Sequence, residues 1–484
     1  MKKWLIKMLS LVLAFSLLLT FAGCEEEEDD EDSGSGKRKP TSHTQVGQPE
    51  EEKTIVLRTA EDLLALSEKL ENYKMDPEVR VILANDIMVN DTKDFATWGT
   101  SETKRAELQN YVPVEHFRGV FDGQGHTISG IYCCVDGVED AYSDPALINR
   151  LYETGTIRNL NMKDCLFYSR EEQRTPAAVV AYCMGTVENC HVSLEIMSLW
   201  NAALLCSTLD DNGVIRNCST AGNGYIFESG NGCTLGGIVS HAGKDSLVEN
   251  CVNYAHLFSD HGVTTGGIAA FTRGDVTHCT NFGYMENTST GAGIVGILDY
   301  SEDEKQPMVT NCLNVGEISA LRGNAGGIVG TARGGVISQC ENRGRIRFFE
   351  DGGGLCSNVS ADGQVIDCLN TGEVVWAQST GSDSEAGGIA ASCDGTVMRC
   401  CNVGDITGGK TAAGTVARIG DERAQIESCY HFGTLTAQNV TDETVTEGNY
   451  EDFDFDTVWN RPQGENQYPT LRNLPKHDPI SPLA

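Results

Sequence analysis

The chain has 484 residues, with 36 Lys and Arg against 69 Asp and Glu, so its formal net charge is −33. Such a charge repels nucleic acid, and no nucleic-acid partner is expected. The 53 glycines, 12 prolines and 7% aromatic residues favour a repetitive chain of short strands and turns.

The N-terminus has the features of an export signal. Lysines precede an apolar stretch over residues 8–22, which is shorter than the roughly 20 residues that span a bilayer, so residues 1–23 are predicted to be a signal peptide. The sequence Phe-Ala-Gly-Cys at 21–24 resembles the lipobox of bacterial lipoproteins, although Phe21 stands where that pattern usually has Leu. The resemblance implies a lipid on Cys24 that anchors the protein to a membrane. A lipidated cysteine also accounts for the odd total of 19 cysteines. An ordinary secretory signal is the alternative.

An acidic segment follows the predicted signal peptide. Residues 25–32 are all Asp or Glu, and a Gly-Ser stretch and a short basic patch come next. Because like charges repel and apolar residues are scarce, residues 24–53 are predicted to be a lipidated Cys24 followed by a disordered tether. A calcium-binding run or an export signal is the alternative for the acids.

The folded region is predicted to begin at residue 54. Residues 54–57 and 79–83 have the composition of β-strands, and residues 117–128 predict a strand, a tight Asp-Gly turn and a second strand. Thr59 is a good N-cap, and leucines at 63, 66 and 70 form one apolar stripe, which predicts an amphipathic helix over about 60–71. Residues 54–145 are therefore expected to hold an N-terminal cap and the first strands.

Internal repetition dominates the rest of the chain. Ten cysteines share a local pattern and recur every 25 to 33 residues. From the second on, Val or Ile stands three residues before each cysteine, six of them have Asn two residues after, and a small-small-apolar block such as Gly-Gly-Ile precedes many of them. The cysteines are Cys165, Cys190, Cys218, Cys251, Cys279, Cys312, Cys340, Cys368, Cys400 and Cys429, and the asparagines are Asn253, Asn281, Asn314, Asn342, Asn370 and Asn402.

A unit of this kind cannot bury its own apolar face, but a stack of such units can. The fold class predicted is therefore all-β, a right-handed parallel β-helix (solenoid) of about ten turns with an N-terminal capping helix. Residues 146–450 are assigned to the repeats, and residues 451–484 to a C-terminal closing segment and tail.

The repeats resemble the GLUG-motif repeats of bacterial surface proteins. The resemblance is carried by the Val/Ile-x-x-Cys-x-Asn-x-Gly pattern, by the Gly-Gly-Ile blocks and by the Phe-Arg-Gly-x-Phe-Asp-Gly segment at 117–123. The aromatic segment at 453–471 is similar to the closing segment of those proteins. The resemblance implies a right-handed β-helix on a cell surface, and it transfers no catalytic residue.

The cysteines are expected to be structural. Neighbours in a parallel stack lie about 4.8 Å apart with parallel side chains, which is poor geometry for a disulfide, so a ladder of free buried thiols is favoured. No metal or other cofactor is expected, because no pair has Cys-x-x-Cys spacing and no histidine completes a ligand set. One member of each adjacent pair, Cys133-Cys134 and Cys400-Cys401, should face away from the core. The asparagines should stack as an amide ladder.

Acidic residues in the loops are the candidates for catalysis. They are Asp210, Asp211, Asp245, Asp260 with His261, and Asp299 to Glu304. Asp210, Asp211, Asp245 and Asp299 are expected to share one edge of the solenoid, and the Asp260-His261 pair lies on another side. With 69 acids in the chain, coincidence explains such groupings, and no His-Glu-x-x-His motif is present. A non-catalytic function is therefore favoured, and no catalytic residue is assigned.

Exposed aromatic residues are better candidates for binding. Strand alternation places Tyr225, Phe227, Phe258 and Phe349 on the outside, and Phe348 and Trp376 in the core. The alternative is that loops fold the outer aromatic rings back as covers of the solenoid. The leading hypothesis is a lipid-anchored, extracytoplasmic protein at the bacterial cell surface that adheres to or captures a glycan or a host or matrix protein. The alternatives are a polysaccharide-active lyase or hydrolase and a structural envelope protein.

Overall fold

The computed structural model of the protein describes most of the chain beyond residue 52. The described residues are 53–73, 75–137, 143–227, 232–259, 262–286, 288–301, 305–377, 383–441, 450–463 and 468–483. The predicted signal peptide, Cys24 and the tether lie outside these ranges, as do Asp260 and His261. Within the described ranges, no helix is long and apolar enough to cross a membrane.

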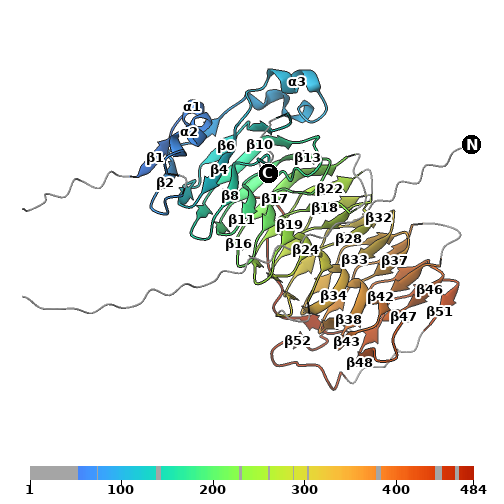
Figure 1. Ribbon diagram of the computed structural model, residues 1–484. Coiled ribbons are helices and arrows are strands. Elements are labelled where there is room, and N and C mark those ends of the chain that lie inside the picture. Colours follow the sequence, from blue (N-terminus) through green and yellow to red (C-terminus); the bar gives the residue numbers. More distant parts are fainter. Residues whose placement is uncertain are drawn as a thin grey trace, which may run out of the picture. The chain divides into compact units, whose positions relative to one another are not determined.

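Three parallel β-sheets wind around one apolar core, as the repeats predict (Figure 1). One turn begins in the third sheet with β18 (Thr234–Gly236), continues in the first sheet with β19 (Val239–Ala242) and β20 (Leu247–Glu249), and ends in the second sheet with β21 (Val252–Asn253) and β22 (His256–Ser259). Each strand pairs in parallel with its equivalent in the next turn. The predicted right-handed parallel β-solenoid is confirmed, with about 13 turns rather than about ten.

The additional turns lie at the N-terminal end. Strands β1 (Thr54–Leu57), β2 (Arg80–Leu83) and β5 (Val120–Asp122) pair in parallel with one another, and β5 pairs with β9 (Thr156–Arg158) of the next turn. The turns that contain these strands have no cysteine at the repeated position, so the repeat pattern did not identify them as turns of the same solenoid. The tight turn after Asp122 joins β5 to β6 (Thr127–Ser129) in a different sheet, so it is a corner of the solenoid.

The predicted N-terminal helix is confirmed, with a break at its centre. It consists of α1 (Ala60–Leu64) and α2 (Leu66–Leu70), and Thr59 caps it through a reciprocal capping box with Asp62. Leu63, Leu66 and Leu70 are buried in the same core cluster as the first strands, which is the stripe the leucine spacing predicts.

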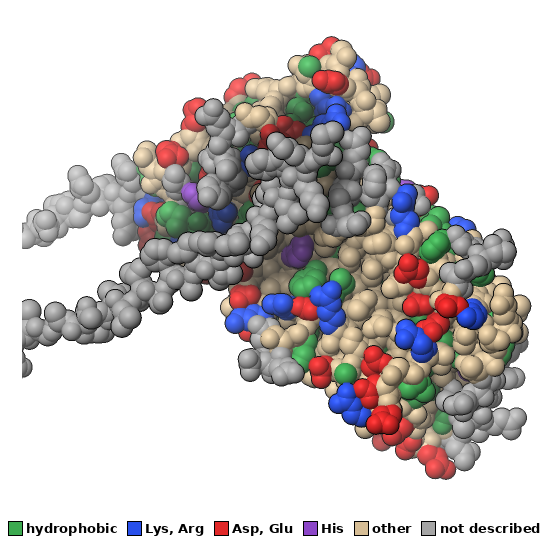
Figure 2. Space-filling view, turned by 45° about the vertical axis from the view of Figure 1, so that its right-hand side comes forward, with side chains coloured by type: hydrophobic (Ala, Val, Ile, Leu, Met, Phe, Trp, Pro, Cys, Tyr) green, Lys and Arg blue, Asp and Glu red, His purple; other side chains and the backbone are tan. Residues whose placement is uncertain are grey.

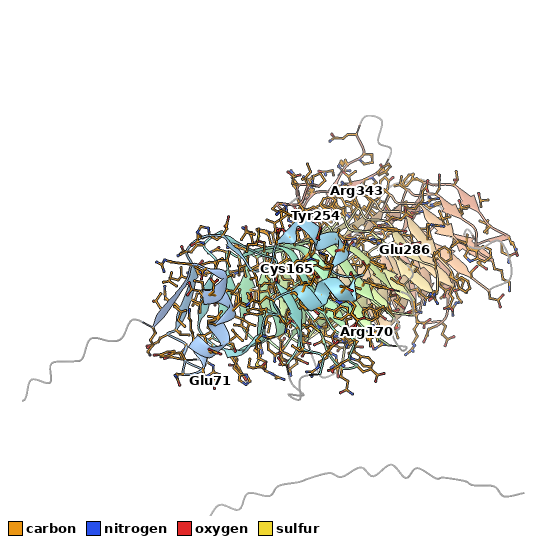
Figure 3. All side chains as sticks on the ribbon, turned by 90° about the horizontal axis from the view of Figure 1, so that it is seen from above. Glu71, Cys165, Arg170, Tyr254, Glu286 and Arg343 are labelled. Carbon is orange, nitrogen blue, oxygen red and sulfur yellow. The ribbon has the colours of Figure 1, made fainter. Side chains whose placement is uncertain are left out.

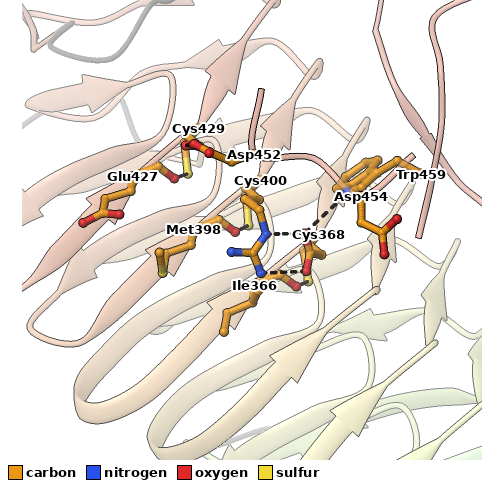
Figure 4. A network of polar contacts seen from close by, with 12 residues as sticks. Ile366, Cys368, Met398, Cys400, Glu427, Cys429, Asp452, Asp454 and Trp459 are labelled. Carbon is orange, nitrogen blue, oxygen red and sulfur yellow. Dashed lines mark hydrogen bonds and ion pairs between the residues drawn. The ribbon is translucent and has the colours of Figure 1, made fainter. Parts of the chain in front are cut away.

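The cysteines form a ladder of free, buried thiols at one corner (Figure 4). Each ladder thiol donates to the carbonyl oxygen two residues earlier at 3.2 to 3.4 Å, from Cys190 to Cys429. Burial raises the pKa of the Cys251 and Cys368 thiols, so they are poor nucleophiles. Cys165, predicted as the first member, is not in the ladder: Asn161 aligns with His191, which places Leu160 beside Cys190.

The residue before each ladder cysteine turns the chain through the corner. At these nine positions φ lies between 51° and 55°. Asn tolerates this left-handed conformation well, but His278, Gln339 and Arg399 adopt it too, at a cost that the surrounding stack must offset.

The predicted amide ladder is confirmed beside the thiol ladder. The side-chain amide nitrogen of each asparagine from Asn253 to Asn370 donates to the amide oxygen of the asparagine in the next turn, at 2.7 or 2.8 Å. Asn402 is the last of the row, and its amide nitrogen donates to His431 Nδ1. The second glycine of each Gly-Gly-Ile block packs on these amides: a Cβ on Gly327 would lie 2.5 Å from Asn342 Cγ. The glycine blocks and the asparagines are therefore two sides of one packing contact.

The C-terminal segment packs along the side of the solenoid. Strands β52 (Trp459–Asn460) and β53 (Thr470–Leu471) form an antiparallel pair that packs with Phe453 on an outward row of the second sheet, Leu369, Cys401 and Tyr430. Farther on, the Tyr254 hydroxyl donates to the Asp478 carbonyl at 2.6 Å, so the segment returns to the middle turns (Figure 1).

This segment explains why Cys401 is buried although it faces away from the core. Cys401 belongs to the cluster under the C-terminal segment, whereas Cys400 belongs to the central core. Cys133 likewise lies in the core, and Cys134 is partly exposed. The predicted division of both cysteine pairs is confirmed.

Candidate functional site

The outer face of the second sheet carries two rows of side chains that form a pocket. Strands β13 (His191–Ser198), β17 (Ser219–Ile226) and β22 alternate between inward and outward residues. Parallel register places Met197, Tyr225 and Phe258 in one outward row, and Glu195, Asn223 and His256 in the next. Residues from three separate turns are thus brought together by stacking alone.

The two aromatic rings of this pocket are nearly parallel. The ring centroids of Tyr225 and Phe258 lie 4.3 Å apart with an interplanar angle of 13°, and both side chains are half-buried. His256 lies 5.0 Å from the Phe258 ring and 5.0 Å from the Tyr284 ring. Rings this close and this parallel are stacked face to face, so they turn their edges to the pocket and form an apolar wall there.

A segment from the first turns forms one wall of the pocket. It runs from η1 (Thr92–Thr97) to α3 (Glu102–Glu107), and Ala96, Gly99 and Thr100 line the pocket. Arg105 holds the segment in place, because its guanidinium donates to the Trp98 and Gly99 carbonyls at 2.9 and 2.8 Å and covers the Tyr168 ring at 4.5 Å. A pocket of about 460 Å³ results. We call it the aromatic pocket and define it by Glu195, Met197, Asn223, Tyr225, His256, Phe258 and this wall.

Glycine is required where the wall approaches the sheet. A Cβ on Gly99 would lie 2.8 Å from Met197 Sδ and 2.9 Å from Glu195 Oε2. Any larger residue would push against the pocket's own side chains, so the depth of the pocket depends on this position.

Glu195 is the half-buried acid of the aromatic pocket. Burial raises the pKa of its carboxyl above the ordinary value, and the hydrogen bond from Asn223 Nδ2, at 3.4 Å, partly opposes that rise. Among the described residues, no cation forms an ion pair with it. At the other end of the row, His256 Nε2 lies 3.4 Å from a Glu286 carboxylate oxygen.

The structure separates the four residues predicted to bind a ligand. Tyr225 and Phe258 lie side by side in the aromatic pocket. The predicted exposure of Phe227 is wrong: its side chain is only 8% exposed, stacks on Tyr168 and lies under the Arg170 guanidinium, which is on the outside of the solenoid (Figure 3). Phe349 is half-buried and is not among the residues that line the pocket.

Strand alternation does not apply to Phe227 and Phe349, because neither residue lies within a strand. Phe227 and Phe349 stand nine residues after their ladder cysteines, but β17 ends at Ile226 and β36 (Ile346–Phe348) ends at Phe348. Inward and outward alternation stops with the strand, so it does not apply to either residue. Within β36 it holds, since Phe348 is fully buried as predicted. Trp376, also predicted as core, is half-buried and packs against the core.

The described loop acids, Asp210, Asp211, Asp245 and Asp299, share one edge of the solenoid and lie among cations, whereas residues 302–304 lie outside the described ranges. Asp299 is 8% exposed and binds the guanidinium groups of Arg273 at 2.8 Å and Arg333 at 3.3 Å. Asp210 and Asp211 line a second pocket, of about 290 Å³, with Lys244, His241, Phe271 and Arg273. Figure 2 shows acidic and basic side chains interspersed over the surface. We call this row of neighbouring acids and cations along the edge the ion ladder, and its pairings are structural.

Residues that bind a metal are not apparent. Within the described ranges, no group of three or more His, Cys, Asp or Glu side chains is arranged to hold an ion.

Glu195, Asn223 and His256 were missed by the sequence analysis. All three stand five residues after their ladder cysteines, so aligning the repeats at that offset would have placed them in one row. The wall at 96–100 gives no such signal, because it lies outside the repeats.

Comparison with known proteins gives distant likenesses only. No family model and no curated protein matches the chain. The chain is similar to a solved structure named "IgA1 Protease", with a TM-score of 0.41 and 15% identity, over 60% of this chain and 22% of that one. It is also similar to a "putative immunoglobulin A1 protease from Bacteroides ovatus", with a TM-score of 0.28 and 15% identity, over 87% and 91% of the two chains. The chain thus spans 22% of the length of the first protein, and neither likeness tells what this chain does.

Proposed function

We propose that this protein is a lipid-anchored, extracytoplasmic β-solenoid that captures a glycan in the aromatic pocket. The observation that carries the proposal is the pair of nearly parallel, half-buried rings of Tyr225 and Phe258 in a pocket of about 460 Å³. The edges of the stacked rings and Met197 give the pocket an apolar wall for the CH groups of a sugar, and Glu195 and Asn223 supply hydrogen-bonding groups for its hydroxyls.

Adhesion is favoured over catalysis by the arrangement of the acids. Hydrolysis of a glycosidic bond by the usual route needs two carboxyl groups about 5 to 9.5 Å apart. Glu195 and Glu286 lie three turns apart, and at about 4.8 Å per turn their strand positions are too widely spaced for that chemistry. The loop acids that share an edge lie in the ion ladder.

The binding proposal is tested by a glycan array and a panel of matrix proteins, probed with the full chain. We expect glycan binding that is lost when Tyr225 and Phe258 are both changed to Ala. The matched control is Phe271→Ala, which removes a half-buried ring that lines the second pocket. Truncation of an anchoring aromatic residue costs about 2 kcal/mol or more, which corresponds to at least about thirtyfold in affinity. Binding of matrix protein alone would contradict the proposal, and release of new sugar ends would favour an enzyme.

The anchor is proposed from the sequence pattern around Cys24 and is tested separately. The wild-type protein should partition into the detergent phase after cloud-point extraction and incorporate labelled fatty acid, whereas Cys24→Ala should do neither. Equal partition of both proteins would contradict lipidation and leave the glycan proposal standing.

A further inference from the structure

The two ends of the solenoid differ in how the core is covered. At the N-terminal end, leucines of α1 and α2 pack on the core of the first turns. The last turn, at the other end, consists of β47 (Val416–Ile419), β48 (Gln425–Glu427), β49 (Tyr430–His431), β50 (Leu435–Thr436) and β51 (Asn439–Val440) (Figure 1). The described chain that follows, from Tyr450, packs on the outward row of the second sheet and not across this end.

Core-facing side chains of the last turn are left in contact with water. Four aliphatic residues stand at such positions, and we call them the end patch: Ile419, Ile426, Leu435 and Val440. By register they align with residues of the preceding turn that are fully buried, namely Cys393, Val397, Ile406 and Ala412. In contrast, Ile419 is 54% exposed and Val440 is 47% exposed, and the other two are partly exposed.

The edges of the sheets are open at the same place. Strands β47, β48, β50 and β51 each pair with their equivalent in the preceding turn, and in the part of the chain that the structure describes none of the four pairs with a strand on its other side. An open edge offers backbone N–H and C=O groups to an added strand. The terminal turn of a solenoid needs a cover for its core, so this end lacks what α1 and α2 supply at the other end.

The rim of this end is acidic. The described residues 416–441 and 450–460 hold seven Asp or Glu residues and two Arg residues. Both arginines already have carboxylate partners, at 2.5 and 2.6 Å: Arg418 with Glu385, and Arg423 with Asp421. Asp452 lies at the last corner, because Ser428 Oγ donates to its carboxylate. The electrostatic field at this end therefore attracts a cationic partner.

Two other occupants fit the open end less well. Residues 442–449, outside the described ranges, contain a single aliphatic residue, Val445, which is too few to cover the four of the end patch. A second copy of the chain would bring the same acids and the same net charge of −33. The N-terminal end of such a copy is already covered by α1 and α2, so it cannot stack head to tail on the last turn.

We infer that the open end docks an extended segment of a partner protein, which adds a strand to the last turn. Its apolar side chains cover the end patch, its Lys or Arg side chains face the acidic rim, and its backbone pairs with the open edges. This interaction is separate from glycan binding in the aromatic pocket and does not depend on it.

Three synthetic peptides test the inference by fluorescence anisotropy with the full chain. The first alternates Lys and Val over eight residues, the second has Glu in place of Lys, and the third is the Lys-Val peptide with alternate backbone nitrogens methylated. Methylation removes N–H donors and leaves the charge unchanged, so it blocks strand addition alone. We expect the Lys-Val peptide to bind at least about tenfold more tightly than either of the others.

A pair of double variants locates the site. Ile419→Glu with Val440→Glu removes apolar contacts and adds negative charge, so it should weaken binding of the Lys-Val peptide at least about tenfold, whereas non-specific attraction would become stronger. The matched control is Met88→Glu with Val112→Glu, which adds the same charge at two exposed positions outside the last turn and should leave the affinity unchanged. Thermal unfolding checks that both variants are folded.

Several outcomes would overturn the inference. They are no binding of the Lys-Val peptide, equal binding of the Glu-Val or the methylated peptide, and unchanged affinity in Ile419→Glu with Val440→Glu. Sedimentation of the free wild-type chain as a dimer that this variant dissociates would show that a second copy covers the end. Slow hydrogen exchange throughout β50 and β51 in the free monomer would show that the chain covers its own end.

Discussion

The amide ladder should carry a large share of the stability of the central turns. Asn342 is fully buried and takes part in four hydrogen bonds: it donates to Asn370 Oδ1 and the Gly344 carbonyl, and it accepts from Asn314 Nδ2 and the Gly344 amide, all at 2.7 to 3.1 Å. Asn342→Leu keeps the branched skeleton of four side-chain heavy atoms and removes all four bonds.

The expected loss follows from these contacts. At about 1 kcal/mol net for each buried hydrogen bond, the free energy of unfolding should fall by about 4 kcal/mol. The two neighbouring asparagines would each lose a partner, so the true loss should not be smaller. In a solenoid each turn contacts only its neighbours, and a weakened central turn uncouples the two halves.

Urea unfolding followed by circular dichroism measures this loss. The variant should unfold at lower urea and with a broadened or two-step transition. Asn358→Leu is the matched control, because Asn358 faces outward, donates to Ser392 Oγ at 2.8 Å and accepts from Ser360 Oγ at 3.3 Å. A loss in Asn342→Leu that is no greater than in this control would refute the reasoning.

Three further predictions concern other parts of the chain. Trp459→Ala should expose Cys401 beneath the C-terminal segment, so maleimide should label that thiol in the variant and not in the wild type; equal labelling would show that the segment does not protect it. Asp299→Asn removes the charge between two arginines that are 44% and 53% exposed and stay hydrated, so the loss in free energy of unfolding should be about 1 kcal/mol or less by urea titration; a loss of several times that would contradict the exposed character of these cations. Burial raises the pKa of the Glu195 carboxyl above its ordinary value of 4.5, so the folded protein holds this proton more tightly than the unfolded chain does. As pH rises through and above 4.5, the free energy of unfolding of the wild type should therefore fall relative to that of Glu195→Gln. Parallel curves of stability against pH for the two proteins would contradict the burial of that carboxyl.

The fold was predictable because equivalent residues recur at nearly regular spacing along the central turns. Cysteine, asparagine and the glycine block recur at equivalent positions, and stacking turns that recurrence directly into ladders. The first three turns escaped because no cysteine stands at the corner that follows β1, β2 or β5. Cys165 misled because its distance from Cys190 fits the repeat, whereas the register places Leu160 at the ladder position of that turn.

The aromatic pocket was predictable only in part. Strand alternation placed Tyr225 and Phe258 correctly, because both lie within a strand. It failed for Phe227, which lies beyond the end of its strand. The wall residue Gly99 comes from a segment about a hundred residues earlier in the chain than Glu195, and no local signal in either segment indicates that they meet.

A crystal structure of the protein with its strongest glycan ligand tests the central claim most directly. The account predicts a sugar ring lying against the edges of the stacked Tyr225 and Phe258 rings, with its polar groups toward Glu195 and Asn223. A ligand bound in the second pocket beside His241 and Phe271, with the aromatic pocket empty, would contradict it.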